Sequence, residues 1–252
     1  MTLKDKIVTG ISYLLHPQKR KLIKLAVIFK SKLGLEIGGP SAFFSIRSYL
    51  PVYLFAERID GVNFSNSTVW EGSIAEGENF EYYPGKKGYQ YISEATDLSK
   101  IPDGKYDFIL SCHSLEHTSN PIKALKEWNR VLKKDGKFAL VLPDKNFTFD
   151  EFRPVTKFEH LEADFEKNMD EQDETHFAEV ISLHSFKKDT GILTKEQLIE
   201  RTNNNYSNRC VHHHVFDFTL IKQMLEYSGF EVEMQRWVAP FHLVSIAKKM
   251  VK

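Results

Sequence analysis

The sequence predicts an α/β fold built on a mixed sheet of seven strands, with helices on both faces. Apolar runs of strand length recur along the chain, and amphipathic helical patterns lie between them, which is typical of β-α-β units and a parallel sheet. The composition agrees, because 252 residues with 42% hydrophobic and 27% charged side chains describe one large globular domain. A disordered, collagenous or coiled-coil chain is excluded.

The first half of the chain contains five of the expected strands. Each is an apolar run of strand length. They are residues 32–37, 58–64, 89–93, 106–111 and 137–142, of which 89–93 is the weakest.

An amphipathic helix is expected over 121–132, where apolar residues recur at the spacing of one helix face. The end of the chain predicts another helix over 218–228, followed by strands over 230–237 and 241–247. The turn between these two strands is so short that they must be antiparallel, which makes the sheet mixed at one edge.

Charge is distributed unevenly, although 34 basic and 34 acidic residues cancel. The balance excludes an overall field that would recruit nucleic acid. Residues 1–32 hold eight Lys or Arg against one acid, so residues 1–30 form a basic N-terminal arm or helix. We expect its apolar side to pack on the sheet; peripheral contact with an anionic membrane is the alternative. Residues 144–180 are strongly acidic and would repel a nucleic-acid backbone.

The sequence predicts a cytoplasmic location. No run approaches the roughly 20 apolar residues that cross a bilayer. Residues 7–15 are apolar but lead into a basic run and not a small-residue cleavage site, so no signal peptide is expected. The two cysteines, Cys112 and Cys210, are too few for a disulfide-stapled scaffold and favour a reducing compartment.

The candidate ligand site is a rim beyond the carboxyl ends of the strands, where open α/β sheets bind their ligands. It comprises Gly38–Ser41, Asn63, Glu94 and Ser111–His113. The glycine turn lacks the G-x-G-x-x-G spacing of a dinucleotide loop and the Gly-Lys-Ser/Thr of a Walker loop. Small residues in this turn still let the backbone approach a ligand.

Four motifs in the sequence resemble those of a known protein family. They are Glu36-Ile-Gly-Gly-Pro-Ser, Glu94-Ala-Thr-Asp-Leu, the run from Tyr106 through Ser-Leu-Glu-His117, and the helix from Pro121 to Asp-Gly136. Together they resemble a class I S-adenosylmethionine-dependent methyltransferase of the type-11 group. The resemblance is clear over residues 33–143 and looser over 212–248, and it implies a Rossmann-like fold.

The resemblance implies S-adenosylmethionine as the cofactor and supplies its contact residues. Asn63 stands where the family usually has an acid for the ribose hydroxyls, so Asp60 could substitute for it. Pro40 replaces a glycine of the first motif. The implied cofactor-binding residues are Glu36, Gly38, Gly39, Pro40, Ser41, Asp60, Asn63, Glu94, Ala95, Ser111, Cys112 and His113.

The resemblance also divides the single domain, 1–252, into parts. Residues 31–143 would be the cofactor-binding core, and 211–252 the closing helix and antiparallel strands. The segment 144–210 would be a substrate-binding insertion after the fifth strand.

Histidines are the candidate bases, because methyl transfer to a hydroxyl usually needs a proton acceptor near neutrality. His113 and His117 follow the fourth strand and His176 lies in the insertion, whereas His213 and His214 belong to a triple-histidine string. Packing or backbone bonding is the alternative for each. In an extended strand His212 and His214 would share one face and His213 the other.

Those histidines could bind a divalent metal with Asp173 or Asp217. We do not favour a metal, because no H-x-x-x-H helix or cysteine pair accompanies them.

The predicted function is O-methylation of a small polar acceptor, with a sugar hydroxyl in glycan or lipopolysaccharide synthesis as the expected class. Aromatic residues outside the motifs, Trp70 and Phe147 among them, could stack on a sugar, and two segments resemble a surface-glycan-associated subgroup of the family. The alternatives are an N- or C-methyltransferase on a small metabolite and a non-catalytic cofactor-binding partner protein. The oligomeric state is left open.

Overall fold

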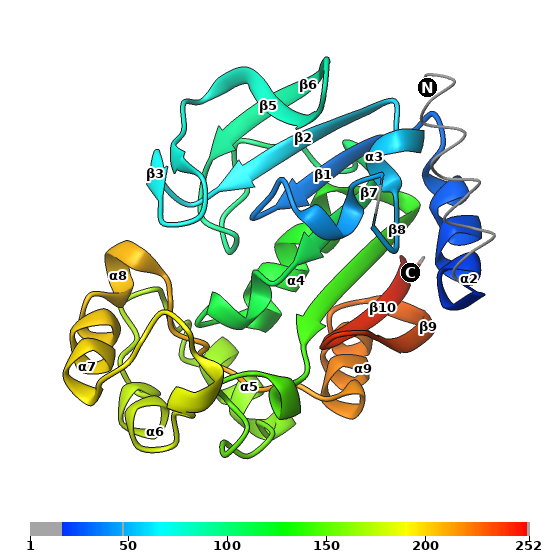
Figure 1. Ribbon diagram of the computed structural model, residues 1–252. Helices are drawn as coiled ribbons and strands as arrows, with labels where there is room; N and C mark the ends of the chain where they lie inside the picture. Colours follow the sequence, from blue (N-terminus) through cyan, green and yellow to red (C-terminus); the bar gives the residue numbers. More distant parts are fainter. Residues whose placement is uncertain (1–16, 47, 251–252) are drawn as a thin grey trace.

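The computed structural model describes residues 17–46 and 48–250, and its main sheet has eight strands with helices on both faces (Figure 1). The strand order is β5-β6-β2-β1-β7-β8-β10-β9. The central strands β6, β2, β1, β7 and β8 run parallel, and β5, β9 and β10 pair antiparallel with their neighbours. The predicted α/β fold with a mixed sheet is confirmed.

The elements have the following bounds. The main strands are β1 (Leu33–Ile37), β2 (Arg58–Asn63), β5 (Gly77–Tyr83), β6 (Lys86–Ile92), β7 (Tyr106–Cys112), β8 (Leu132–Pro143), β9 (Phe230–Val238) and β10 (His242–Lys249). A separate small hairpin consists of β3 (Ser67–Thr68) and β4 (Gly72–Ser73). The helices are α2 (Pro17–Ala26), α3 (Val52–Phe55), α4 (Pro121–Val131), α5 (Phe158–Glu166), α6 (Phe177–Ser182), α7 (Lys195–Asn203), α8 (Asn205–Asn208) and α9 (Phe218–Tyr227).

The sheet has one strand more than the seven expected, because the sequence patterns miss β5. Its buried side chains are Phe80 and Tyr82, and acidic residues between and before them hide the alternation. Pro84 and Gly85 turn the chain into β6, with Gly85 at φ +76°. The sheet is therefore antiparallel at both edges and not at one.

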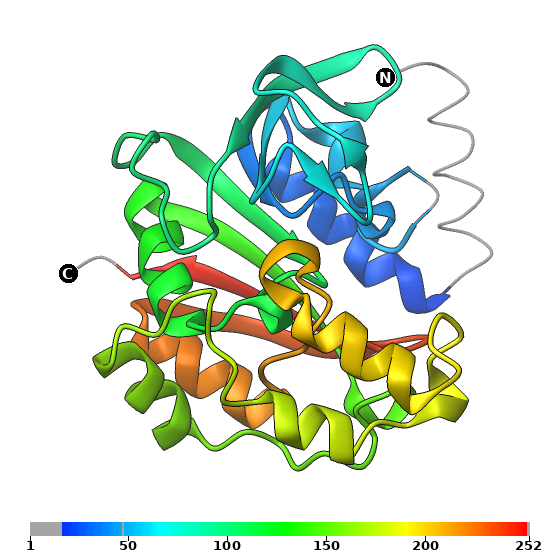
Figure 2. The same cartoon turned by 90° about the vertical axis from the view of Figure 1, so that its left-hand side faces the viewer.

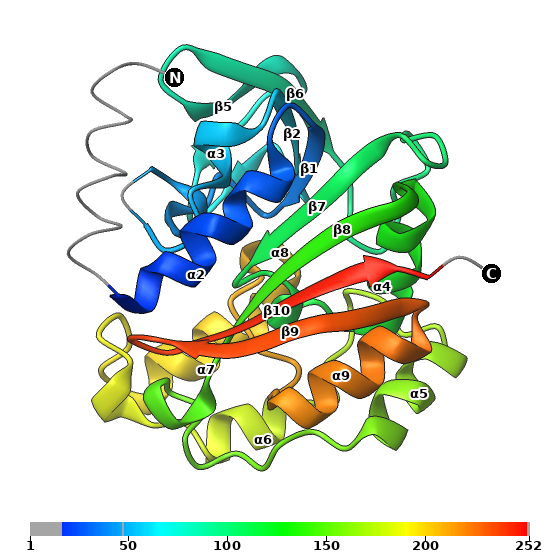
Figure 3. The same ribbon diagram turned by 90° about the vertical axis from the view of Figure 1, so that its right-hand side faces the viewer.

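Two apolar cores cover the two faces of the sheet. The strands and the helices that flank them are drawn in Figure 3. Side chains alternate along β7, so that Ile109 packs in the core with α4, α5 and α9, while Phe108 and Leu110 pack in the core with α2. Helix α4 begins where expected, because Asn120 caps the Lys123 backbone amide.

The described part of the basic arm packs on the sheet, as expected. Leu22 and Ala26 of α2, and Phe29 after it, are fully buried, while Lys21 and Lys24 are exposed. Residues 1–16 of the arm lie outside the described residues. Within residues 17–46 and 48–250, no helix has the length and apolar character to traverse a bilayer.

The segment 144–210 is largely helical and contains α5 to α8. Figure 1 shows α6, α7 and α8 gathered on the side toward which β1 and β2 point, and Figure 2 views the molecule from that side. The segment therefore lies near the carboxyl ends of the parallel strands.

Candidate active site

A cavity of about 700 Å³ opens beyond the carboxyl ends of β1, β2, β6 and β7, where the sequence predicted the ligand rim. Its walls also include side chains from the segment 144–210 and from the start of β10. The predicted site residues that line it are Gly38, Pro40, Ser41, Asn63, Glu94, Ala95, Cys112, His113 and His117. Among the described lining residues, the predicted Glu36, Gly39, Asp60, Ser111, His176, His213 and His214 do not appear.

A buried carboxylate fixes the conformation of the glycine turn after β1. Glu36 accepts hydrogen bonds from the Tyr53 hydroxyl at 2.7 Å and the Ser41 amide at 2.9 Å. Burial raises the pKa of Glu36 to about 7, although both bonds oppose the rise. Gly38 has φ +75°, and a Cβ there would lie 2.7 Å from Ser114 Oγ. Glu36 thus shapes the turn and is not among the residues that line the cavity.

The acid expected to replace Asn63 lies elsewhere. Asp60 accepts hydrogen bonds from Arg58 Nε and the Tyr106 hydroxyl, each at 2.8 Å, in the middle of β2. Asn63 lines the cavity and donates from Nδ2 to the Gly39 carbonyl at 3.1 Å, which ties the end of β2 to the glycine turn. Asp60 therefore cannot take the place of the ribose acid.

An arginine bridges the strand ends to the segment 144–210. Arg209 donates from Nη2 to Glu94 and from Nη1 to Glu171, each at 2.7 Å, and its guanidinium lies 4.9 Å from the Phe64 ring centroid. Burial raises the pKa of Glu171 to about 7 despite Arg209. The Glu94 carboxylate, expected at the adenine edge, is thus already oriented by this bridge.

One wall of the cavity carries two histidines and a buried glutamate. His113 Nε2 lies 2.8 Å from His242 Nδ1, and His113 Nδ1 lies 3.4 Å from Glu116 Oε1. Glu116 is 1% exposed, and neither of its oxygens has a hydrogen-bond partner within the described part of the chain. Burial would raise the pKa of Glu116, but His113 and His117 outweigh it and keep the pKa below its ordinary value. Glu116 is therefore an ionised carboxylate that lines the cavity.

A histidine-aspartate pair lies beside this carboxylate. His212 Nδ1 donates to Asp150, which also accepts from Arg153 Nη1 at 2.8 Å. Burial lowers the pKa of His212, but the Asp150 carboxylate more than offsets it, so the pKa is raised. Since Nδ1 carries the proton, Nε2 of neutral His212 is a lone-pair acceptor. One ring nitrogen of His212, one of His117 and an oxygen of Glu116 lie within 4.8 Å of one another.

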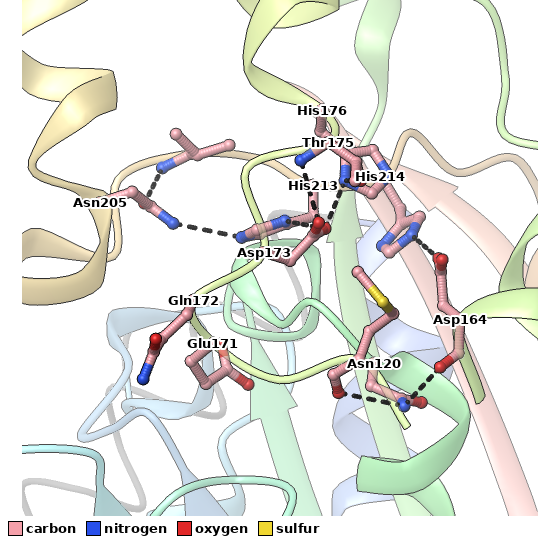
Figure 4. A network of polar contacts seen from close by, with 12 residues as sticks. Asn120, Asp164, Glu171, Gln172, Asp173, Thr175, His176, Asn205, His213 and His214 are labelled. Carbon is pink, nitrogen blue, oxygen red and sulfur yellow. Dashed lines mark hydrogen bonds and ion pairs between the residues drawn. The ribbon is translucent and has the colours of Figure 1, made fainter. Parts of the chain in front are cut away.

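The other candidate bases lie outside the cavity wall. His176 donates from Nδ1 to Asp173 at 2.9 Å, and His214 lies with Nε2 3.0 Å from Asp164 (Figure 4). The expected alternation in the triple-histidine string is wrong, because this stretch is not a strand. His213 packs with His176 and His214, and His212 alone reaches the cavity.

Sequence reasoning missed His212, His242, Glu116 and Arg209 as site residues. His212 belongs to the conspicuous histidine string, and Glu116 to the Ser-Leu-Glu-His block, so both had a signal. Arg209 stands at the head of that same string, whereas His242 had no signal, because it reaches the cavity only through the pairing of β10.

Part of the chain is similar in sequence to a known protein family. Residues 51–140 match a family model described as a methyltransferase domain, a range that contains Glu94, His113 and Glu116. No curated protein matches the chain.

Three solved structures show the likeness of fold. A protein of Bacillus halodurans assigned as a methyltransferase is 14% identical with a TM-score of 0.52, over 93% of this chain and 100% of its own. The 1,6-didemethyltoxoflavin-N1-methyltransferase of Burkholderia thailandensis, which holds S-adenosylhomocysteine, is 12% identical with a TM-score of 0.52, over 94% and 78%. A Listeria monocytogenes protein assigned as an S-adenosylmethionine-dependent methyltransferase is 16% identical with a TM-score of 0.50, over 93% and 97%.

Proposed function

We propose that this chain, which carries a class I S-adenosylmethionine-dependent methyltransferase domain of the type-11 group, methylates an oxygen atom of a small polar acceptor, and that the acceptor is a sugar hydroxyl. The observation that carries the proposal is the His212–Asp150 pair beside Glu116 in the cavity that the glycine turn also lines. An oxygen acceptor loses a proton as it is methylated, and a histidine oriented by a carboxylate is suited to accept it.

The residues of the cavity fit S-adenosylmethionine. Gly38 has no side chain and Ser41 has a small one, so the cofactor can approach the backbone of the turn. Asn63 at the end of β2 and Glu94 after β6 present polar groups to the same cavity. When bound, this cofactor supplies an electrophilic methyl group on a sulfonium. The chain's own part is to orient the acceptor and to hold its proton at His212 Nε2.

Exposed aromatic rings support a sugar acceptor. Trp70 is 55% exposed and Phe147 is 53% exposed, yet both line the cavity, so their faces are available to a ligand. Aromatic faces pack on the apolar faces of sugar rings, while Glu116 and Glu171 can accept hydrogen bonds from hydroxyls. The assignment to glycan or lipopolysaccharide synthesis rests on this chemistry and on the resemblance of two segments to a surface-glycan-associated subgroup.

The rate of methyl transfer should depend on pH with an acid limb. Because His212 must be neutral to accept a proton and its pKa is raised above its ordinary value, kcat/KM should fall about tenfold per unit as pH drops below that pKa. Labelled S-adenosylmethionine with a panel of monosaccharides, nucleotide sugars and amines measures this. The H212Q variant should lose the acid limb. A profile flat from about pH 6 to 9, with transfer only to amines, would instead support the N-methyltransferase alternative.

The glycine turn offers a second test, with a matched control. Gly38 and Gly85 have nearly the same backbone angle, φ +75° and +76°, but a Cβ at Gly85 meets nothing within 4 Å. Both alanine variants should lose about 1 kcal/mol of folding stability through the backbone angle. Gly38→Ala should lose more than Gly85→Ala, because its Cβ would press on Ser114. Only Gly38→Ala should weaken S-adenosylmethionine binding, by about tenfold or more, in calorimetric titration with NAD as the negative control. Equal affinities in the two variants would separate the turn from the cofactor.

A further inference from the structure

A second cluster of titratable side chains lies beneath the cavity, within the segment 144–210 and the stretch that follows it. One imidazole nitrogen from each of three histidines and one carboxylate oxygen lie within 4.8 Å of one another. The four residues, here called the histidine-aspartate cluster, are His160, Asp164, His176 and His214.

The cluster joins three parts of the chain that are separate in sequence. His160 and Asp164 are four residues apart on α5 and so share one face of that helix. His176 stands at the start of α6, and His214 precedes α9. His160 Nε2 lies 2.9 Å from His176 Nε2 and 3.4 Å from Asp164 Oδ2, which lies 3.0 Å from His214 Nε2.

A network of polar contacts around Asp173 surrounds His176 and orients its ring (Figure 4). The Val211 amide donates to Asn205 Oδ1, so Asn205 donates from Nδ2 to His213 Nε2. His213 therefore carries its proton on Nδ1, 3.6 Å from Asp173.

Asp173 completes the network. It accepts from the Thr175 amide and from His176 Nδ1, each at 2.9 Å. His176 Nδ1 thus carries a proton, and the lone pair of Nε2 is directed at His160 and Asp164. A carboxylate that orients a histidine in this way is the usual outer partner of a metal ligand.

The charges of the cluster call for a cation. Asp164 and Asp173 are both buried, and the ion pairs that the described residues form with them all come from histidines. Buried carboxylates are costly unless a positive charge lies beside them.

We propose that the histidine-aspartate cluster binds one zinc ion with four protein ligands, and that Asp173 is its outer carboxylate. Three imidazole nitrogens and one carboxylate oxygen form a ligand set that zinc accepts in tetrahedral geometry. With all four positions filled by the protein, the ion is structural, and it ties α5, α6 and the histidine string together beneath the cavity.

The test is the zinc content of untagged protein purified from zinc-supplemented cells, measured by mass spectrometry after dialysis. We expect about one zinc per chain in the natural protein and loss of it in His160→Ala and His214→Ala. His160 is half-exposed, so its removal spares the core. Asp173→Asn should weaken the affinity about 10- to 100-fold. The matched control is His184→Ala, because His184 is buried beside Asp189 in the same segment but outside the cluster.

Cobalt and a chelator provide independent readouts. Cobalt alone, added to stripped protein, should give the intense visible bands of a tetrahedral site, and a chelator should lower the Tm of the natural protein but not of His160→Ala. The proposal is overturned if stripped protein binds neither metal, or if His160→Ala retains full zinc. It is also overturned if zinc is lost in His212→Ala and kept in His160→Ala, since the ion would then lie in the cavity.

Discussion

Replacing His212 with alanine is expected to lower kcat for methyl transfer about 10²- to 10⁴-fold, the usual contribution of a positioned base. The Asp150 carboxylate orients the His212 ring and raises its pKa. Because His212 itself lines the cavity, it can accept the proton directly from an acceptor bound there. The affinity for S-adenosylmethionine should change by less than about threefold, since the variant removes an interaction needed only in the reaction. Single-turnover kinetics and calorimetry measure the two quantities separately.

His242 is the control for this prediction. It lines the same cavity but has no carboxylate partner among its described contacts. Burial lowers the pKa of His242 to about 4, which makes it a weak base near neutral pH. His242→Ala should therefore lower kcat less than His212→Ala. The reverse order, with both variants folded by thermal melting, would assign the base to His242 and not to His212.

Replacing Arg153 with methionine is expected to lower the free energy of unfolding by about 3–5 kcal/mol. Arg153 is 2% exposed and donates to Asp150 at 2.8 Å, to the His212 carbonyl at 2.7 Å and to the His213 carbonyl at 3.0 Å. Methionine fills much of the same space but leaves the buried Asp150 carboxylate with His212 as its remaining side-chain partner. Urea denaturation followed by circular dichroism measures the difference.

An exposed pair provides the matched control. Lys222 and Glu226 lie 3.8 Å apart on the surface of α9, with side chains 57% and 51% exposed. Lys222→Met should change the free energy of unfolding by no more than about 0.5 kcal/mol. If Arg153→Met stays within that range, the buried arginine is not what holds the histidine string in place.

The sequence was sufficient for the elements that form the parallel sheet. Strand β7 and residues 138–142 of β8 are buried on both faces and are nearly continuous apolar stretches, and β1 and β2 are buried along most of their length. Strand β5 escaped because it is an edge strand with one buried side. Its Glu78 and Glu81 face solvent, and a pattern with so few apolar residues is typical of a loop.

The candidate site was predictable only where it follows the strand ends. Gly38, Asn63, Glu94 and His113 line the cavity because the parallel strands bring their carboxyl ends together. The roles of the histidines in the segment 144–210 and in the triple-histidine string could not be told apart from the sequence. His212 pairs with Asp150 across 62 residues, and that pairing depends on helix packing that no local pattern encodes.

The position of β10 in the sheet bears on how the chain folds as it is synthesised. This strand is the last of the described elements, yet it lies between β8 and β9. Until residues 242–249 leave the ribosome, β8 has an unpaired, apolar edge that invites pairing with another nascent chain. The parallel strands can associate earlier, but the edge of β8 is covered only when β10 is inserted.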